Sequence, residues 1–211
     1  VPLPSVGNGR DEDGGSGIMA AGTTRDQIAA AADRLFYECG FEATSFADIA
    51  AAVNLSRGNF YYHFKSKDEI LAAVIARRVE TTRAALDAWA AAAAGPADGI
   101  RSFIGMLVAN RAKIMRHGCP VGTLCAELAK LDHAAQGDAA AIFTLFRTWL
   151  ADRFAALGHG ADADALALHA LMRSQGIAAL ATALHDEAFI DREVEALEAW
   201  LDDLPQAPAR P

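Results

Sequence analysis

Apolar side chains recur three or four positions apart along most of the chain, which is the spacing of one face of an α-helix. The first such face is made by Ile28, Ala32, Leu35, Phe36 and Cys39. Gly40 follows, and glycine is the residue that helices favour just past their ends. Because no segment alternates convincingly between apolar and polar residues at period two, the sequence predicts an all-α protein.

Two short helices joined by a tight turn are expected next. Ser45 can cap the first helix, and Ser56 can cap the second. Between them, Asn54 can adopt the left-handed backbone conformation of a sharp turn. Phe60 and Phe64 lie four positions apart and should form the buried side of the second helix. The pattern therefore predicts a helix-turn-helix.

A long helix is expected from Lys67 to about Trp89, spanning roughly 34 Å at the usual rise per residue. It is long enough to connect two separate bodies. Beyond the Gly95-Pro96 pair, further helical patterns occupy residues 100–114, a short segment from about 120, and residues 142–154, 162–185 and 191–204. The whole chain should hold about nine helices.

Composition and charge place limits on this picture. The chain has 211 residues, is 53% hydrophobic and carries a formal net charge of −8. Its longest uncharged stretches hold about a dozen residues, short of the roughly 18 to 20 apolar positions that a membrane span needs, so no membrane helix is expected. Three cysteines, an odd number without an evident framework, favour the reducing cytoplasm.

An acidic total usually argues against a nucleic-acid partner, because phosphate binding needs a positive surface. One segment departs from the total: between Leu55 and Lys67 the charged residues are Arg57, Lys65 and Lys67, all basic. A helix that begins Ser-Arg-Gly-Asn can enter the DNA major groove by its N-terminus. The basic segment therefore makes the second short helix a candidate recognition helix.

Each residue type in this segment has a physical task at DNA. Arg57 can reach guanine or a phosphate, Asn59 can pair with adenine, and Gly58 permits close approach. Tyrosine and histidine side chains can contact phosphates, and Lys67 lies in a first helical turn where backbone donors also favour a phosphate. A buried core explains Phe60 and Phe64 but not every ring. The candidate DNA-binding residues are Ser45, Ser56, Arg57, Gly58, Asn59, Tyr61, Tyr62, His63 and Lys67.

Residues 24–71 resemble the DNA-binding domain of the TetR family of bacterial transcription regulators. The likeness is densest in "GFEATSFADIAAAVNLSRGNFYYHFKSKDEIL", which holds the Ala-Thr-Ser entry, the Tyr-Tyr-His-Phe run and the Ser-Lys-Asp-Glu cap. Asn59 departs from the threonine more often found there, which leaves the operator sequence open. The resemblance implies a homodimer, a ligand cavity in the C-terminal body, and release from DNA when an effector fills that cavity.

The resemblance also divides the chain. It implies a helix-turn-helix DNA-binding domain at 23–67 and a ligand-binding and dimerisation domain at 68–204, with the connector helix at 68–90. Residues 1–22, rich in glycine and acidic residues, and residues 205–211 are expected to be disordered tails. In the family the last two long helices form a four-helix interface. The candidate interface residues are Gly176, Ala179, Ala183, Leu197, Trp200, Leu201 and Leu204, although a monomeric core could use the same side chains.

The segment "HGCPVGTLCAEL", residues 117–128, resembles a Gly-Cys-Pro-x-Gly segment in one branch of the family, where some members answer to aromatic or electrophilic molecules. Proline is favoured at the first helical position, which would place Cys119 at the N-cap, where a helix dipole makes a thiol more reactive. Two hypotheses stay open: Cys119 senses oxidants or electrophiles, or it is a small residue completing a turn. A zinc site with His117, Cys125 and His133 fits no ordinary spacing, so no metal or other cofactor is expected.

Several side chains are candidates for an effector pocket, although at helical spacing an ordinary core is the plainer explanation. They are Phe103, Leu107, Cys119, Phe146, Trp149, His169 and Met172. The sequence thus indicates a repressor whose partners are double-stranded operator DNA, a second copy of itself and a small-molecule effector. The effector would tilt the connector helix and change the recognition-helix separation from the roughly 34 Å of one DNA turn. The alternatives are an activator or architectural DNA-binding protein, and an enzyme using Cys119 and a histidine, which lacks any nucleophile motif.

Overall fold

The computed structural model describes residues 23–204, and every regular element in that range is an α-helix. The all-α prediction is confirmed, while the predicted tails at 1–22 and 205–211 lie outside the described residues. In chain order the helices are α1 (Thr24–Cys39), α2 (Phe46–Ala52), α3 (Arg57–His63), α4 (Lys67–Ala92), α5 (Pro96–Ala109), α6 (Arg111–His117), α7 (Pro120–Lys130), α8 (Gln136–Ala156), α9 (Ala163–Leu184) and α10 (Glu187–Asp202).

The single helical pattern predicted at 100–114 forms two helices in the structure, α5 and α6. The apolar pattern at 100–114 is interrupted at Asn110, whose backbone leaves the helical conformation with φ −110° and ψ 12°. The side-chain amide of Asn110 donates to the carbonyl oxygen of Met106 at 2.8 Å, a local bond that competes with continued helix. The described part of the chain therefore has ten helices, where the sequence pattern indicated about nine.

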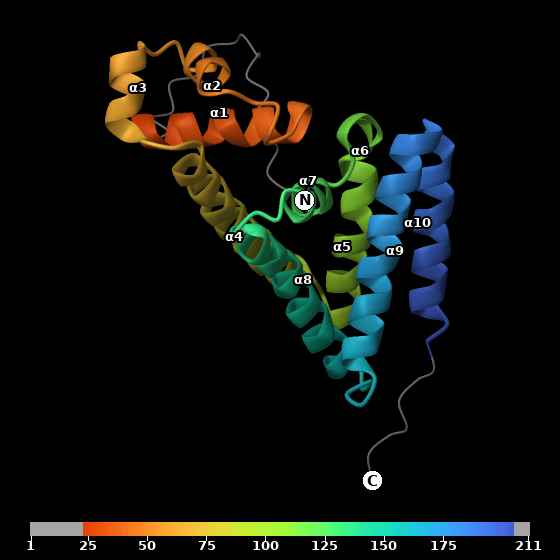
Figure 1. The fold of residues 1–211 in the computed structure, drawn as a ribbon. Helices are drawn as coiled ribbons and strands as arrows, with labels where there is room; N and C mark the ends of the chain where they lie inside the picture. The colour runs from red at the N-terminus through yellow and green to blue at the C-terminus, as the bar shows by residue number, and fades with distance from the viewer. Residues whose placement is uncertain (1–22, 205–211) are drawn as a thin grey trace, which may run out of the picture.

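Helices α1, α2 and α3 form a small head at one end of the molecule (Figure 1). The predicted caps and turn are confirmed: the Ser45 hydroxyl accepts from the Asp48 amide at 3.2 Å, and Asn54 adopts a φ of 58°. Phe60 and Phe64 are buried in the head, as the four-residue spacing predicted. The local chemistry of the sequence thus positions α3 on the head.

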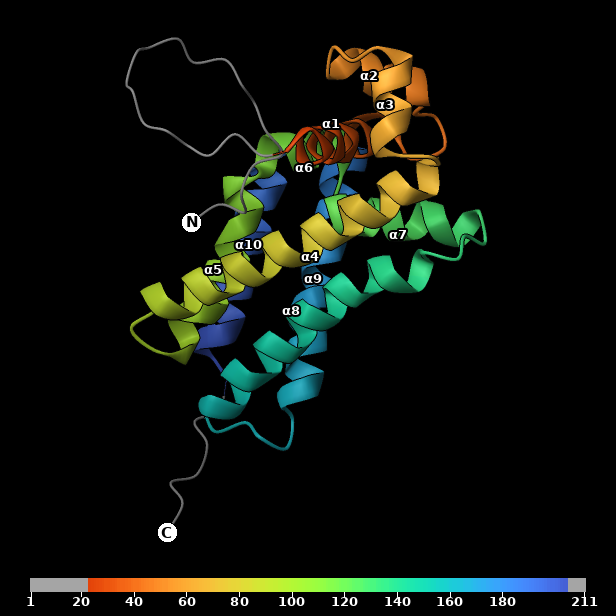
Figure 2. The same ribbon diagram turned by 90° about the vertical axis from the view of Figure 1, so that its left-hand side faces the viewer.

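The body is built from the remaining helices. The long helix α4 slants away from the head and runs beside α8, and α5, α9 and α10 stand together on the other side (Figures 1 and 2). The body core is mainly aliphatic and holds a few aromatic side chains, among which Phe103 packs on Phe146 with ring centroids 5.7 Å apart. Within residues 23–204, no helix combines the length and hydropathy that a membrane span requires.

Helix α7 belongs to both parts of the molecule. Leu124 and Leu128 of α7 are buried in the same apolar cluster as the head residues Ile28 and Phe36. At its other end, Cys119 and Val121 pack against the core of the body. Figure 1 shows α7 almost end-on between the two. A rigid displacement of α7 would therefore shift its packing contacts in the head as well as in the body.

Candidate functional site

The recognition helix α3 has one buried and one open side. Its buried side is anchored by Phe60 and Phe64, which are 1% and 0% exposed. Tyr61 and Tyr62, by contrast, are 49% and 79% exposed, although aromatic rings are usually packed. The space where a side chain would stand at Gly58 holds no atom within 4 Å. The open side thus combines a smooth backbone with rings that are not needed for the core.

The two exposed tyrosines are held differently. The Tyr61 ring stacks on Phe46 of α2 with centroids 5.4 Å apart and planes inclined by 13°. Tyr62 meets the His63 ring edge-on, at 5.2 Å. Because Phe46 supports its ring, Tyr61 presents its hydroxyl from a defined position, as a contact to a phosphate or base requires. Ser45 and Ser56, also predicted to bind DNA, are exposed and are both helix N-caps.

Two cations that the sequence reasoning did not select hold the C-terminal end of α3. Arg25 of α1 donates from Nη1 to the His63 carbonyl at 2.5 Å and lies over the Phe64 ring, 4.0 Å from its centroid. Lys65 donates from Nζ to the Tyr61 carbonyl. Positive groups are favourable at this end of a helix, where carbonyl groups lack helical partners. These cations position α3 through its backbone.

The Lys67 ammonium is held by backbone carbonyl oxygens of the head. It donates to the carbonyl oxygens of Phe41, Glu42 and Thr44 at 3.1, 3.2 and 3.4 Å. It also lies 4.4 Å from the centre of the Phe41 ring, and its side chain is only 24% exposed. These contacts tie the start of α4 to the loop between α1 and α2. Sequence reasoning did not find these contacts because the acceptors are backbone atoms more than twenty residues earlier, and the DNA contact of Lys67 stays a prediction.

Replacing Lys67 by methionine is expected to lower the free energy of unfolding by about 1–3 kcal/mol, because the loop carbonyls lose a charged donor. Urea denaturation measures this change. The salt dependence of DNA binding should stay the same, since a lost phosphate contact would reduce the salt slope by about one. A stable Lys67→Met protein with a reduced slope would contradict the structural role.

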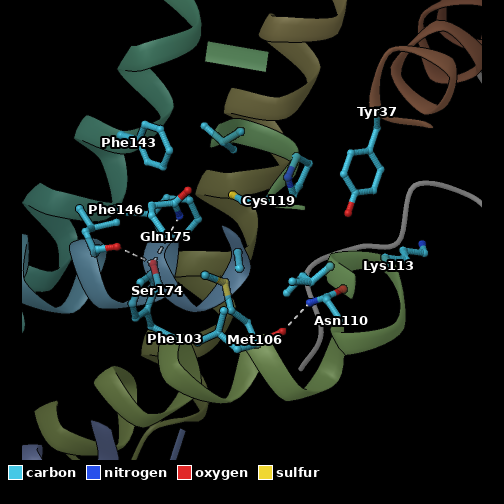
Figure 3. Close-up of a pocket in the computed structure, with 16 residues that line it drawn as sticks. Tyr37, Phe103, Met106, Asn110, Lys113, Cys119, Phe143, Phe146, Ser174 and Gln175 are labelled. Carbon is cyan, nitrogen blue, oxygen red and sulfur yellow. Dashed lines mark hydrogen bonds between the residues drawn. The ribbon is translucent and has the colours of Figure 1, made fainter. Parts of the chain in front are cut away.

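The body holds a partly open cavity of about 90 Å³, several times the space that one water molecule needs (Figure 3). Its walls come from α1, from α5 and α6, from the start of α7, and from α8 and α9. The lining residues are Tyr37, Phe103, Met106, Leu107, Asn110, Lys113, Ile114, Cys119, Pro120, Val121, Phe143, Phe146, Leu171, Ser174, Gln175 and Ala178. Apolar walls with a few polar groups are the usual character of a small-molecule site.

The structure gathers some of the predicted pocket residues and separates others. Phe103, Leu107, Cys119 and Phe146 line the cavity. Trp149, His169 and Met172 do not. Trp149 packs edge-on against Trp89, and the His169 ring lies 4.6 Å from that of Trp200. Met172 is 61% exposed on the outer side of α9. Helical spacing predicts that a side chain lies on an apolar face of its own helix, but it does not show which neighbouring element covers that face.

Tyr37 is the lining residue that comes from the head, and the sequence reasoning did not select it. Its hydroxyl donates to the Gly118 carbonyl at 2.7 Å. Burial raises the pKa of Tyr37 well above its usual range, so the hydroxyl stays protonated and acts as a donor. Figure 3 shows its ring pointing from α1 toward the cavity. No local pattern could have found this contact, because the two residues lie 81 positions apart.

Cys119 has the predicted position at the N-cap of α7, with Pro120 as the first helical residue. Its sulfur accepts from the Gly122 amide at 3.4 Å. Burial raises the pKa of Cys125, the other thiol on this segment. Within residues 23–204, no group of three or more His, Cys, Asp and Glu side chains is placed to hold a metal ion. The N-cap geometry is therefore confirmed, whereas electrophile sensing by Cys119 stays a prediction.

An apolar stripe runs along the outer side of α9. It consists of Leu168, Met172, Leu180 and Leu184, which are 44%, 61%, 50% and 60% exposed. The small residues Gly176, Ala179 and Ala183, predicted for a dimer interface, are exposed on the same helix. Exposed apolar side chains gathered on one face are typical of interaction surfaces.

The four α10 residues predicted for the same interface are placed differently. Leu197 and Leu201 are 0% and 6% exposed and belong to the core of the body, so their apolar surface is already covered within one protomer. Trp200 packs on Phe154 with centroids 5.9 Å apart, and Leu204 is partly buried against the same core. Of the two helices predicted to form the interface, α9 thus leaves more apolar surface exposed than α10 does.

A helix-turn-helix head joined to an all-helical body with a cavity defines the class of one-component transcription regulators. The family profile described as "Bacterial regulatory proteins, tetR family" matches residues 28–74. A second profile, "Transcriptional regulator LmrA/YxaF-like, C-terminal domain", matches residues 96–201. The chain therefore belongs to the TetR family of bacterial transcription regulators.

Individual relatives agree with this assignment. An uncharacterised HTH-type transcriptional regulator of Lactococcus lactis is 29% identical over 135 residues, which cover 63% of this chain and 69% of the relative. The negative transcriptional regulator IcaR of the Staphylococcus aureus biofilm operon is 44% identical over 46 residues, 22% of this chain and 25% of IcaR. A solved TetR regulator from Legionella pneumophila superposes with a TM-score of 0.74 at 25% identity, covering 87% of this chain and 98% of that one.

Proposed function

We propose that the protein is a homodimeric repressor that binds a palindromic operator through α3 and leaves it when a small molecule fills the cavity. The observation that carries this proposal is the coexistence, in one chain, of an open recognition helix and a mainly apolar cavity whose wall includes a head residue. The exposed Tyr61 and Tyr62 supply the DNA side. Tyr37 supplies the contact between the cavity and the head.

Repression is proposed over activation because IcaR, which is 44% identical to this chain over 46 residues, is described as a negative regulator. A footprint on upstream DNA distinguishes the two. A repressor should protect one palindrome that overlaps a promoter. Protection of long stretches without a palindrome would favour the architectural alternative, and a protected site upstream of the promoter would favour activation.

The proposed homodimer rests on the α9 stripe of Leu168, Met172, Leu180 and Leu184. A twofold axis brings the same patch of each subunit together, so one apolar stripe can cover its own copy. The adjacent small residues Gly176, Ala179 and Ala183 would let the two helices approach closely. Such a dimer would place two heads on successive turns of the duplex.

The α3 contacts are tested by single substitutions. Arg57→Ala should weaken operator binding about tenfold or more, and Tyr61→Phe about threefold or more, because each removes a polar group that the proposal assigns to DNA contact. Fluorescence anisotropy with a selected operator duplex measures both affinities. Arg192→Ala on α10 is the matched control, since it removes an exposed cation outside the head. Unchanged affinity in both α3 variants, with the fold retained, would contradict the assigned roles.

A further inference from the structure

The DNA-binding head contributes directly to the wall of the cavity, whereas the connector helix α4 does not. Among the described residues, none of the cavity-lining side chains comes from α4, the helix whose tilt the sequence pattern led us to expect. Tyr37 of α1 lines the cavity instead, together with Cys119, Pro120 and Val121 at the start of α7. A molecule in the cavity would therefore meet the head and α7 directly.

Tyr37 and the start of α7 are joined at the cavity wall. The Tyr37 hydroxyl donates to the carbonyl of Gly118, the residue immediately before Cys119. Gly118 has a φ of 77°, and a Cβ there would stand 2.9 Å from Cγ2 of Thr123. The turn therefore requires glycine, and its backbone determines where the accepting carbonyl points. The His117 ring also lies 5.2 Å from the Tyr37 ring.

A buried ion pair makes a second connection at the same end of α7. Arg78 donates from Nε to Asp33 Oδ1 at 2.6 Å, and from Nη1 to the Pro120 carbonyl. The side chains of Arg78 and Asp33 are 7% and 9% exposed. Since Asp33 lies on α1 and Pro120 lines the cavity, Arg78 links the head to the cavity wall.

The other end of α7 is bound to the head as well. The Glu127 carboxylate accepts from the backbone amides of Phe41 and Glu42 at 2.9 and 2.8 Å. Leu124 and Leu128 lie in the apolar cluster of the head. Charged hydrogen bonds of this kind are among the stronger ones in proteins. The later part of α7 is thus held to the head, while its first turn lines the cavity.

We propose that Tyr37 and α7 carry the effector signal to the recognition helix. A molecule that fills the cavity displaces the first turn of α7 from the Tyr37 hydroxyl, and the head turns with α7 because Glu127 and the leucines keep them together. In this scheme α4 lines no described part of the cavity and takes part only through Arg78, which joins Asp33 of α1 to the Pro120 carbonyl. The inference rests on the proposed function, namely that filling the cavity releases the operator. Tyr37 and Glu127 are positioning residues, since both act on DNA through the orientation of the head.

The test fills the cavity from two different elements and measures operator affinity. In a Cys39→Ser, Cys125→Ser parent, N-phenylmaleimide attached to Cys119 adds a ring from the α7 side, with full modification verified by mass spectrometry. Independently, Ala178→Phe adds a ring from α9, where Ala178 lines the cavity and is 2% exposed. The coupling ratio is the dissociation constant of the filled protein divided by that of the empty protein. For the parent we expect about tenfold or more, within the usual range of allosteric coupling.

Tyr37→Phe keeps the ring and removes the hydrogen bond to Gly118. It should lower the coupling ratio about three- to tenfold, the effect of one buried hydrogen bond. A merely structural role would change the affinity of the filled and empty proteins together and leave their ratio unaltered. Ser102→Ala is the control: it removes one hydroxyl from α5, outside the cavity lining and outside the DNA-binding head, and its ratio should equal that of the parent.

Glu127→Gln supplies a second variant should Tyr37→Phe fail to fold. Its coupling ratio should also fall, because the substitution weakens the hydrogen bonds that hold α7 to the head. A parent ratio near one with both rings would overturn the proposed function and this inference together. A large parent ratio that stays the same in Tyr37→Phe and Glu127→Gln would overturn the inference alone. In that case the signal would travel through other contacts, and the repressor proposal would stand.

Discussion

Replacing both Leu180 and Leu184 by glutamate is expected to turn the protein into a monomer and to weaken operator binding at least about a hundredfold. The two leucines are half or more exposed on α9, so the change leaves the core of the protomer intact. In the dimer it would bring four carboxylates to a shared apolar surface, where desolvation and like charge both oppose association. Because the dimer holds two half-sites at once, its loss removes an avidity gain of about 10²–10⁴.

Sedimentation velocity and fluorescence anisotropy measure the two effects. Leu131→Glu is the matched control, since Leu131 is also exposed, at 40%, but lies at the end of α7 outside the stripe. That variant should remain dimeric. A dimer that persists in the Leu180, Leu184 double variant would show that the stripe is not the interface.

Asp33→Ala should destabilise the fold by about 3–5 kcal/mol, because it leaves the Arg78 guanidinium buried without its counter-charge. Arg78 Nη2 is already buried without a partner among the described atoms, so no spare acceptor is at hand. Urea denaturation gives the free energy of unfolding. Asp87→Ala, at an exposed position on the same long helix as Arg78, should change it by less than about 0.5 kcal/mol.

A double replacement separates the ion pair from simple packing. Asp33→Leu with Arg78→Met removes both charges together and should recover much of the lost stability, since an apolar pair of similar size often replaces a buried ion pair without loss. If Asp33→Ala were as stable as Asp87→Ala, the pair would have no part in holding α1 to α4 and α7.

The head was predictable because its signals are local. Ser45 with Asp48, Asn54 at the turn, and the spacing of Phe60 and Phe64 all act within a few residues, and the structure confirms each. The helix break at Asn110 is local too, but it depends on whether the Asn110 side chain donates to the Met106 carbonyl or to solvent. The spacing of apolar residues does not show which of these hydrogen bonds forms.

Four of the predicted pocket residues do line the cavity, but its connections to the head were not predictable, because they join distant parts of the chain. Tyr37 reaches Gly118, and Lys67 turns back to the loop after α1. Periodicity also shows a face without showing what covers it, which is why Leu197 and Leu201 looked like interface and are core. The α9 stripe did leave a readable signal: Leu168, Met172, Leu180 and Leu184 belong to one series of every fourth residue.

The most direct test of the central claim is a salt titration of binding to DNA. The unmodified protein, without effector, is measured against a palindrome selected from its own upstream region and against a scrambled duplex of equal length. We expect selective binding to the palindrome by a dimer, with an affinity that falls steadily as salt rises because phosphate contacts release counterions. Equal affinity for both duplexes, or no salt-sensitive binding to either, would contradict the account of α3 as a recognition helix.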